Sequence, residues 1–265
     1  MPSPNTPQPQ ANIFRSYSVI HIPFQEQKPL DVPGKAHYDT FMPFRKTPLI
    51  TSQVYHLFNR GINGMAMFLG KRTYSRFLLA LEYYQHKHVP VKLSHFITLS
   101  GDDRESIFID LRRDKRKLID LYCYCLMPNH FHLLVKQTGQ HGITTYMQKL
   151  LNSYSSYYNL VADRKGPLFQ GPFKAVRIET DEQFFNVSRY IHINPYVGHV
   201  IERKNLLTYP NSSLPIYLYG INASIINTKP ILGQFNTITH YRKFILDQAD
   251  YKQSQENFKY LYLEE

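Results

Sequence analysis

Two histidines one residue apart stand in an otherwise apolar run, residues 127–135. In a β-strand, side chains alternate between the two faces, so His130 and His132 emerge on one side while the residue between them points to the other. One face of this strand is typical of a hydrophobic core, and the other is typical of a metal site. Two neutral imidazoles on a rigid strand can hold one ion and leave coordination positions for a substrate.

A tyrosine and an asparagine four residues apart form a second reactive pair. Tyr190 and Asn194 lie in the segment 188–195, and this spacing puts both side chains on one face of a helix. If that face meets the histidines, Asn194 can add an oxygen ligand and Tyr190 stands beside the metal as a nucleophile. A phenol with an ordinary pKa of about 10 is a poor nucleophile, so it needs an activated phosphate. The pattern therefore indicates phosphoryl transfer to tyrosine.

The charge of the chain favours a polyanionic partner. Its 265 residues include 31 Lys and Arg against 20 Asp and Glu, a formal net charge of +11. Most of this excess lies between residues 51 and 210, around the reactive side chains. Such a balance is typical of nucleic-acid binding, although solvated lysines of an ordinary soluble protein are the simpler explanation. The candidate phosphate-binding residues are Arg60, Lys165, Lys174 and Arg177.

The segments that must position these residues alternate between strand and helix patterns. Hydrophobic periodicity predicts strands at 53–58, 117–126, 130–136 and 173–178, and helices at 73–88, 106–113, 143–158 and 180–194. This order predicts an α+β fold: an antiparallel, ferredoxin-like (split βαβ) sheet with helices on one face. The helix that carries Tyr190 is an additional, catalytic helix, and extended N- and C-terminal segments flank the domain.

Local signals set several of these boundaries. Thr180 and Gln183 resemble a capping box at the start of the last core helix, and Pro195 predicts its end. In the strand before the histidines, alternation puts Cys123 and Cys125 on one face and Tyr122 on the other. The tyrosines at 154, 157 and 158 are assigned to packing.

Composition divides the chain into three parts. Residues 1–50 are rich in proline and predict a partly disordered arm, residues 51–210 form the catalytic domain, and residues 211–265 form a helical accessory segment with a helix around 239–250. The two cysteines, alternate in a strand, are poorly placed to bond each other, which fits a reducing, cytoplasmic location. No apolar run of membrane-spanning length appears, so no membrane association is expected.

Three motifs in order resemble those of the HUH-type tyrosine transposases, specifically the REP-associated branch. They are Met127-Pro128-Asn129-His130-Phe131-His132-Leu133-Leu134-Val135, then Gly166-Pro167-Leu168-Phe169-Gln170-Gly171, then Tyr190-Ile191-His192-Ile193-Asn194-Pro195. The segments Tyr55–Gly61 and Tyr209–Ser213 also look like landmarks of this family, so the resemblance covers roughly residues 52–220.

The resemblance implies a site and a reaction. His130 and His132 would be metal ligands with Asn194 as the third, and the ion would be magnesium or manganese. Tyr190 would form a 5′-phosphotyrosine link and release a 3′-hydroxyl. The implied substrate is single-stranded DNA with hairpin ends. A monomer is favoured, and a homodimer is possible.

Several alternatives remain at this point. The segment His86-Lys87-His88 is a second His-x-His, so the motif alone carries little weight, and most of the chain's 21 tyrosines must be packing or surface residues. Cys123 and Cys125 could join the histidines in a zinc site. The protein could also be a replication or conjugation nicking enzyme of the HUH class, or a domesticated, non-catalytic hairpin-DNA-binding protein.

Overall fold

The computed structural model describes residues 48–221 and 224–249. The chain divides into two units, residues 1–44 and residues 45–265, and every described residue belongs to the second unit. Apart from residues 48–50, the predicted proline-rich arm lies outside the described residues, and so does the accessory segment from residue 250 onward. The predicted division into an arm, a catalytic domain and an accessory segment stays a prediction.

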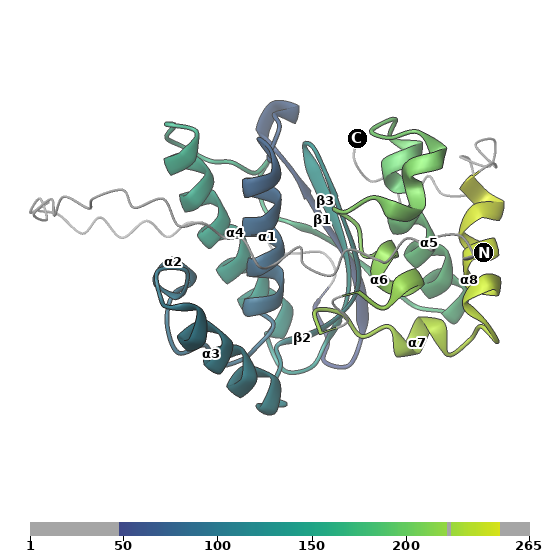
Figure 1. Cartoon of the computed structure of the whole chain (residues 1–265), viewed down its shortest axis with the longest axis horizontal. Coiled ribbons are helices and arrows are strands. Elements are labelled where there is room, and N and C mark those ends of the chain that lie inside the picture. The colour runs from purple at the N-terminus through teal and green to yellow at the C-terminus, as the bar shows by residue number, and fades with distance from the viewer. Residues whose placement is uncertain (1–47, 222–223, 250–265) are drawn as a thin grey trace, which may run out of the picture. The chain divides into compact units, whose positions relative to one another are not determined.

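A four-stranded antiparallel sheet runs through the centre of the described unit (Figure 1). Its strand order is β2-β3-β1-β4, with helices connecting β1 to β2 and β3 to β4. This is the split βαβ arrangement, so the predicted ferredoxin-like fold is confirmed. The strands are β1 (Val54–Arg60), β2 (Ile119–Met127), β3 (His130–Gln137) and β4 (Lys174–Ile178).

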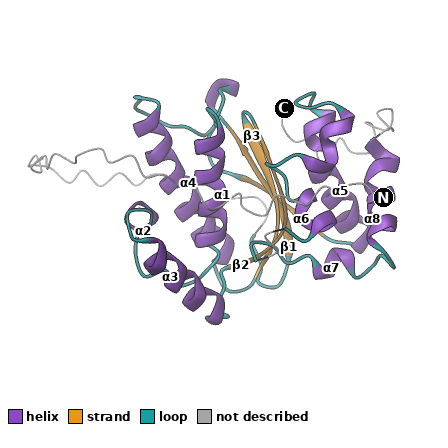
Figure 2. Cartoon of the chain, in the orientation of Figure 1, coloured by secondary structure: helices purple, strands orange, loops and turns teal. Residues whose placement is uncertain are grey.

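Helices cover both faces of this sheet (Figure 2). On one face lie α1 (Lys71–Tyr83) and α4 (Gly142–Val161), the two helices of the split βαβ plan. The additional helix that carries Tyr190 is α5 (Asp181–Val197), and it lies on the other face. It is joined there by α6 (Leu214–Tyr219), α7 (Lys229–Leu232) and α8 (Ile238–Ala249). The predicted layer of helices on one face is therefore observed, and α5 to α8 form a second layer on the other face.

The remaining elements are short or lie at the periphery. Between α1 and β2 the chain forms α2 (Leu93–Phe96) and α3 (Gly101–Arg113), and 3-10 turns occur at Ile62–Gly64 and Arg203–Thr208. The third helix begins five residues before its predicted start because Ser100 caps it, accepting a hydrogen bond from the Asp103 N–H at 3.1 Å. Among the described residues, no helix has the length and apolar character needed to cross a membrane.

Tyrosines fill the core between the sheet and the α1–α4 layer. Tyr154 is fully buried and packs edge-on against Phe77 of α1, with ring centroids 4.8 Å apart. Its hydroxyl donates a hydrogen bond to the Met67 carbonyl at 2.6 Å, and the hydroxyl of Tyr158 donates to the Ala66 carbonyl at 2.7 Å. A buried phenol needs such a partner. These contacts confirm that Tyr154 and Tyr158 of α4 have a packing role.

The edge strand β2 departs from regular alternation at Tyr122. Leu121 pairs with Val135 and Cys123 with Leu134, so the register shifts between them and Tyr122 is the additional residue. The Tyr122 ring packs against Phe184 of α5 with centroids 5.3 Å apart. The expectation that Tyr122 lies on the face opposite to the cysteines is therefore wrong, because a β-bulge resets the alternation.

The predicted start of α5 is correct, but its predicted end is wrong. Thr180 accepts a hydrogen bond from the Gln183 N–H at 3.1 Å, and the Gln183 side chain accepts one from the Glu179 N–H at 2.8 Å. The helix continues through Pro195 to Val197. A proline in the last turn removes only one backbone hydrogen bond, and the Gly198 N–H still donates to the Asn194 carbonyl at 2.7 Å.

A buried histidine connects α5 to the C-terminal part of the described chain. His192 is fully buried, with its Nε2 2.8 Å from the Ser213 hydroxyl and its Nδ1 2.8 Å from the hydroxyl of Tyr241 in α8. One turn away, the guanidinium of Arg189 lies 4.3 Å from the centre of the Phe244 ring. The segment from residue 211 therefore packs against α5, and through Ser213 it also contacts the backbone of Tyr124 in β2.

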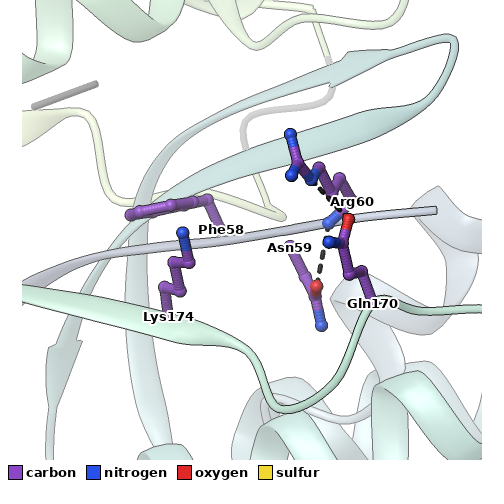
Figure 3. A pocket seen from close by; sticks show the side chains of 5 residues that line it. All are labelled: Phe58, Asn59, Arg60, Gln170 and Lys174. Carbon is purple, nitrogen blue, oxygen red and sulfur yellow. Dashed lines mark hydrogen bonds between the residues drawn. The ribbon is translucent and has the colours of Figure 1, made fainter. Parts of the chain in front are cut away.

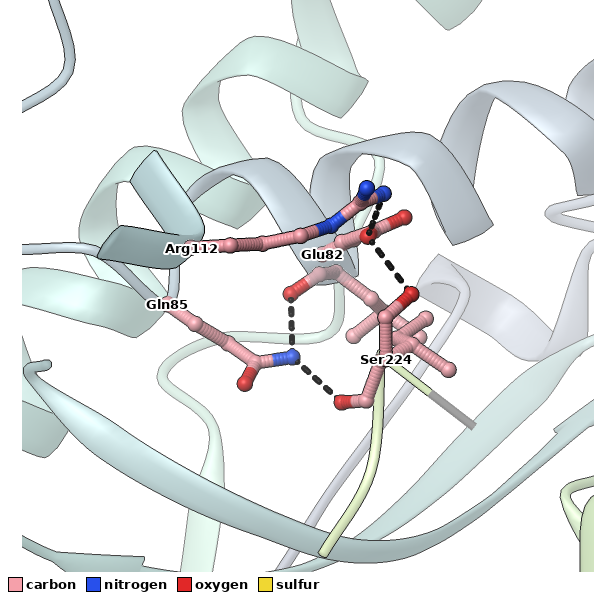
Figure 4. A network of polar contacts seen from close by, with 6 residues as sticks. Glu82, Gln85, Arg112 and Ser224 are labelled. Atoms are coloured by element: carbon pink, nitrogen blue, oxygen red, sulfur yellow. Dashed lines mark hydrogen bonds and ion pairs between the residues drawn. The ribbon is translucent and has the colours of Figure 1, made fainter. Parts of the chain in front are cut away.

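The same segment also reaches α1 (Figure 4). Ser224 donates a hydrogen bond to the Glu82 carboxylate at 3.2 Å, and Arg112 of α3 forms an ion pair with that carboxylate at 3.5 Å. The buried amide of Gln85 donates to the Ile225 carbonyl at 2.8 Å. Two residues after Ile225 the chain covers the edge of β2, where the Asn227 N–H donates a hydrogen bond to the Leu121 carbonyl at 2.8 Å.

We expect Tyr241→Phe to lower the free energy of unfolding by about 1–3 kcal/mol, because it leaves Nδ1 of the buried His192 without a partner. Urea unfolding followed by circular dichroism measures the loss. Tyr219→Phe is the matched control, since Tyr219 is 56% exposed. Equal stability of the two variants would show that the His192–Tyr241 contact contributes nothing.

Candidate active site

The pairing of β1 with β3 brings the histidines under α5. In this antiparallel ladder Phe58 lies opposite His132 and Arg60 opposite His130. Strand alternation turns these four side chains to the face that α5 covers, while Phe131 packs against Phe77 of α1 on the other face, with ring centroids 5.3 Å apart. The predicted division of this strand into a core face and a polar face is therefore observed.

The two polar residues of α5 meet His132 directly. The Tyr190 ring lies edge-on to the His132 ring, with centroids 5.4 Å apart and an angle of 78° between the planes. Asn194, one turn later, places its Nδ2 3.5 Å from Nε2 of His132. The rings of His130 and His132 are 5.0 Å apart at 85°. The structure thus brings together all four residues that the sequence proposes for catalysis and metal binding.

A third histidine, His56 of β1, belongs to the same group. Its Nε2 lies 3.0 Å from Nδ1 of His132, and the two rings stack with centroids 5.1 Å apart. Sequence reasoning did not assign His56 to the site. A polar residue in the middle of the apolar strand 54–58 was the available signal, but only the register with β3 shows which side chain it meets.

The three histidines differ in exposure and in their tendency to take up a proton. Burial lowers the pKa of His56 to about 3. Burial also lowers the pKa of His132 well below its usual range, and the nearby His56 and His130 lower it further. Both rings are therefore neutral at physiological pH, as metal-ligating imidazoles must be. His130 is only partly buried, at the end of the strand.

These donors fit a divalent metal ion that is completed by other ligands. Nδ1 of His130 lies 2.7 Å from the Asn129 side-chain oxygen, which can only accept, so Nδ1 carries a proton and Nε2 is the nitrogen left to bind a metal. His132 could add a second nitrogen, and Asn194, whose Nδ2 faces that nitrogen in this structure, could add its amide oxygen after rotation of the amide. Within the described residues, no three His, Cys, Asp or Glu side chains are grouped so that they could hold a metal ion. Further ligands would have to be water or phosphate oxygens.

The cysteines beside this site do not suit a zinc ion. Cys125 lies opposite His132 in the β2–β3 ladder, and both Cys123 and Cys125 are fully buried. Burial raises the pKa of each thiol well above its usual range, so the thiolate that zinc requires is disfavoured.

A surface hollow lies across the end of β1 (Figure 3). It is lined by Phe58, Asn59, Arg60, Gln170 and Lys174. The side-chain Nε of Arg60 donates to the Gln170 side-chain oxygen at 2.6 Å. The ammonium of Lys174 lies 5.7 Å from the centre of the Phe58 ring, which is in turn 6.0 Å from the His132 ring. Two of the four candidate DNA-binding residues therefore stand beside the candidate metal site.

The other two candidate DNA-binding residues lie elsewhere. Arg177 is opposite Tyr55 in the β1–β4 ladder, whereas Lys174 is opposite Phe58. Residues three apart in a strand point to opposite faces, so Arg177 faces away from the histidines and donates to the Gln53 side chain at 3.1 Å. Lys165 is exposed in the loop after α4.

We expect the free energy of unfolding to fall as the pH is lowered from about 6.5 toward 3. Burial lowers the pKa of His56 and of His192 to about 3, so in this window the unfolded chain binds more protons than the folded one. Each such histidine should cost about 1.4 kcal/mol per pH unit. Urea unfolding between pH 7 and pH 5 measures the slope.

Substitution of one buried and one exposed histidine tests this cause. His192→Gln should reduce the pH slope, whereas His95→Gln, at an exposed position, should leave it unchanged. A stability that does not change between pH 7 and pH 5 would contradict the neutral, buried state of these rings.

Comparison with known proteins finds a family similarity in the centre of the chain. Residues 103–194 match the family model described as "Transposase IS200 like". A solved structure of a REP-associated tyrosine transposase bound to a REP hairpin is 14% identical, with a TM-score of 0.45, and the alignment covers 66% of this chain and 84% of that one. No curated protein matches the chain. The residues that match the IS200-like transposase model contain His130, His132, Tyr190 and Asn194.

Proposed function

We propose that this protein is a metal-dependent transposase that cleaves and rejoins single-stranded DNA through a 5′-phosphotyrosine at Tyr190. The observation that carries the proposal is the contact of Tyr190 and Asn194 with His132 beneath α5. Tyr190, the imidazoles of His130 and His132, and the Asn194 amide meet at one point of the fold, within a segment that matches a transposase family model.

His130, His132 and Asn194 would hold the metal. The ion would withdraw charge from phosphorus and stabilise the leaving oxygen. Magnesium prefers oxygen ligands, and two of the three donors here are nitrogens. Of the two ions expected from the sequence, this donor set therefore suits manganese better.

Tyr190 would then supply the nucleophile. Its phenolic oxygen forms a bond to phosphorus while the bond from phosphorus to the 3′-oxygen breaks. The phenol loses one proton and the released 3′-oxygen gains one, so the step balances. Rejoining is the reverse reaction with a 3′-hydroxyl. Tyr190 is only 6% exposed, which limits access of water and protects the phosphotyrosine from hydrolysis.

Arg60 and Lys174 are the best-placed residues for holding the DNA strand. They line the hollow next to His132, and their charges would bind phosphates that flank the reacting one. Lys165 and Arg177 lie outside this hollow and would contact DNA further from the chemistry. We propose DNA with hairpin ends as the substrate, in line with the sequence resemblance.

The assembly that we favour is a monomer acting on DNA in the cytoplasm. His56, His130, His132, Tyr190 and Asn194 meet within one chain, so chemistry needs no residue from a second copy. A homodimer would be compatible with this arrangement but is not required by it.

We expect Tyr190→Phe to abolish the covalent protein–DNA adduct, because the substitution removes the attacking oxygen and keeps the ring that packs on His132. The measurement uses a library of labelled single strands, each with a hairpin, incubated with Mn²⁺ and separated on a denaturing gel. Wild-type protein should give a band that depends on the metal and resists boiling in detergent.

Tyr196→Phe, on the same helix but a different face, is the matched control and should retain the adduct. An adduct with Tyr190→Phe would contradict the nucleophile assignment. Binding of hairpin strands by the wild-type protein without any adduct would favour the non-catalytic hairpin-binding alternative.

A further inference from the structure

His56 occupies a place in the fold where an apolar side chain would be expected. It is fully buried in the middle of β1, where its neighbours across the two ladders are Leu134 and Val176. Its Nε2 contacts Nδ1 of His132 at 3.0 Å, but its own Nδ1 is buried and has no hydrogen-bond partner. A buried polar atom without a partner destabilises the fold.

Asn194 fixes the direction of the His56–His132 hydrogen bond. Its Nδ2, which can only donate, points at Nε2 of His132 at 3.5 Å, so this nitrogen carries a lone pair. In a neutral imidazole the proton is then on Nδ1, and His132 donates it to Nε2 of His56. His56 keeps its own proton on the unpartnered Nδ1.

We propose that His56 is a positioning residue for the metal site. By accepting the Nδ1 proton of His132, it fixes the tautomer in which Nε2 is the ligating nitrogen, and it orients that nitrogen toward Asn194 and Tyr190. This inference rests on the proposed function only in taking a metal as the ligand of His132. The tautomer itself is argued from the positions of His56 and Asn194 at the two ring nitrogens of His132.

A neutral partner suits the chemistry proposed for this site. Metal-ligating histidines are often oriented by a carboxylate, which adds negative charge behind the metal. The nearest partner here is an uncharged imidazole, so the site keeps more positive charge for a phosphodiester. The use of a neutral imidazole as the partner of His132 leaves Nδ1 of His56 without a hydrogen bond, which lowers the stability of the fold.

The experiment compares Mn²⁺ binding by DNA-free protein variants. Titration followed by electron paramagnetic resonance gives the dissociation constant. His56→Phe keeps a ring of similar size without an acceptor and should weaken Mn²⁺ binding about 10–100-fold. His56→Gln keeps an oxygen that can accept the Nδ1 proton and should restore affinity to within about threefold of wild type. His86→Phe, at a buried histidine remote from the site, should have no effect.

A second measurement on the metal-free wild-type protein needs no variant. Long-range ¹H–¹⁵N correlation spectra report which nitrogen of each histidine carries the proton, and His132 should carry it on Nδ1. A proton on Nε2 of His132 would overturn the inference, as would unchanged Mn²⁺ binding by a folded His56→Phe variant. Absence of Mn²⁺ binding by the wild type would instead contradict the proposed function. The spectra would then still test, by the position of the His132 proton, whether His56 fixes the tautomer.

Discussion

The register between β1 and β3 is the constraint on which the site depends. With Phe58 opposite His132, the polar face of each strand turns toward α5 and the apolar face turns toward α1 and α4. A slip of one residue would turn both histidines of β3 into the core and break the contact with His56. Because each strand packs against helices on both sides, the fold strongly specifies this register.

The two helical layers use their buried polar groups differently. Between the sheet and the α1–α4 layer, tyrosine hydroxyls donate to backbone carbonyls, so packing and hydrogen bonding reinforce each other. Beneath α5, the histidines contact one another and Asn194, and Nδ1 of His56 remains unpartnered. An unsatisfied buried polar atom lowers the stability of the fold, and such atoms are expected at functional sites. His192 and Tyr241 hold the helix that covers it.

Much of this arrangement could be predicted from the sequence because it depends on local patterns. The turn at 127–129, the helical period of α4 and the capping box at Thr180 are local signals, and each predicted its element correctly. The proximity of the Tyr190 helix to the histidines came from the family resemblance. The β-bulge at Tyr122 and the continuation of α5 through Pro195 to Val197 depend on tertiary contacts, and the sequence pattern could not reveal them.

The contribution of His56 depends on the pairing of strands that are far apart in the chain, so one sequence cannot show it. The side of the sheet on which Arg177 lies could have been predicted, because residues three apart in a strand point to opposite faces and Lys174 is three residues earlier.

The central claim, a metal held beside Tyr190, is tested most directly by anomalous diffraction at the manganese edge from crystals grown with Mn²⁺. One peak within ligand distance of Nε2 of His130 and of His132 is the predicted result. No peak there, or a peak beside Cys123 and Cys125 instead, would contradict it.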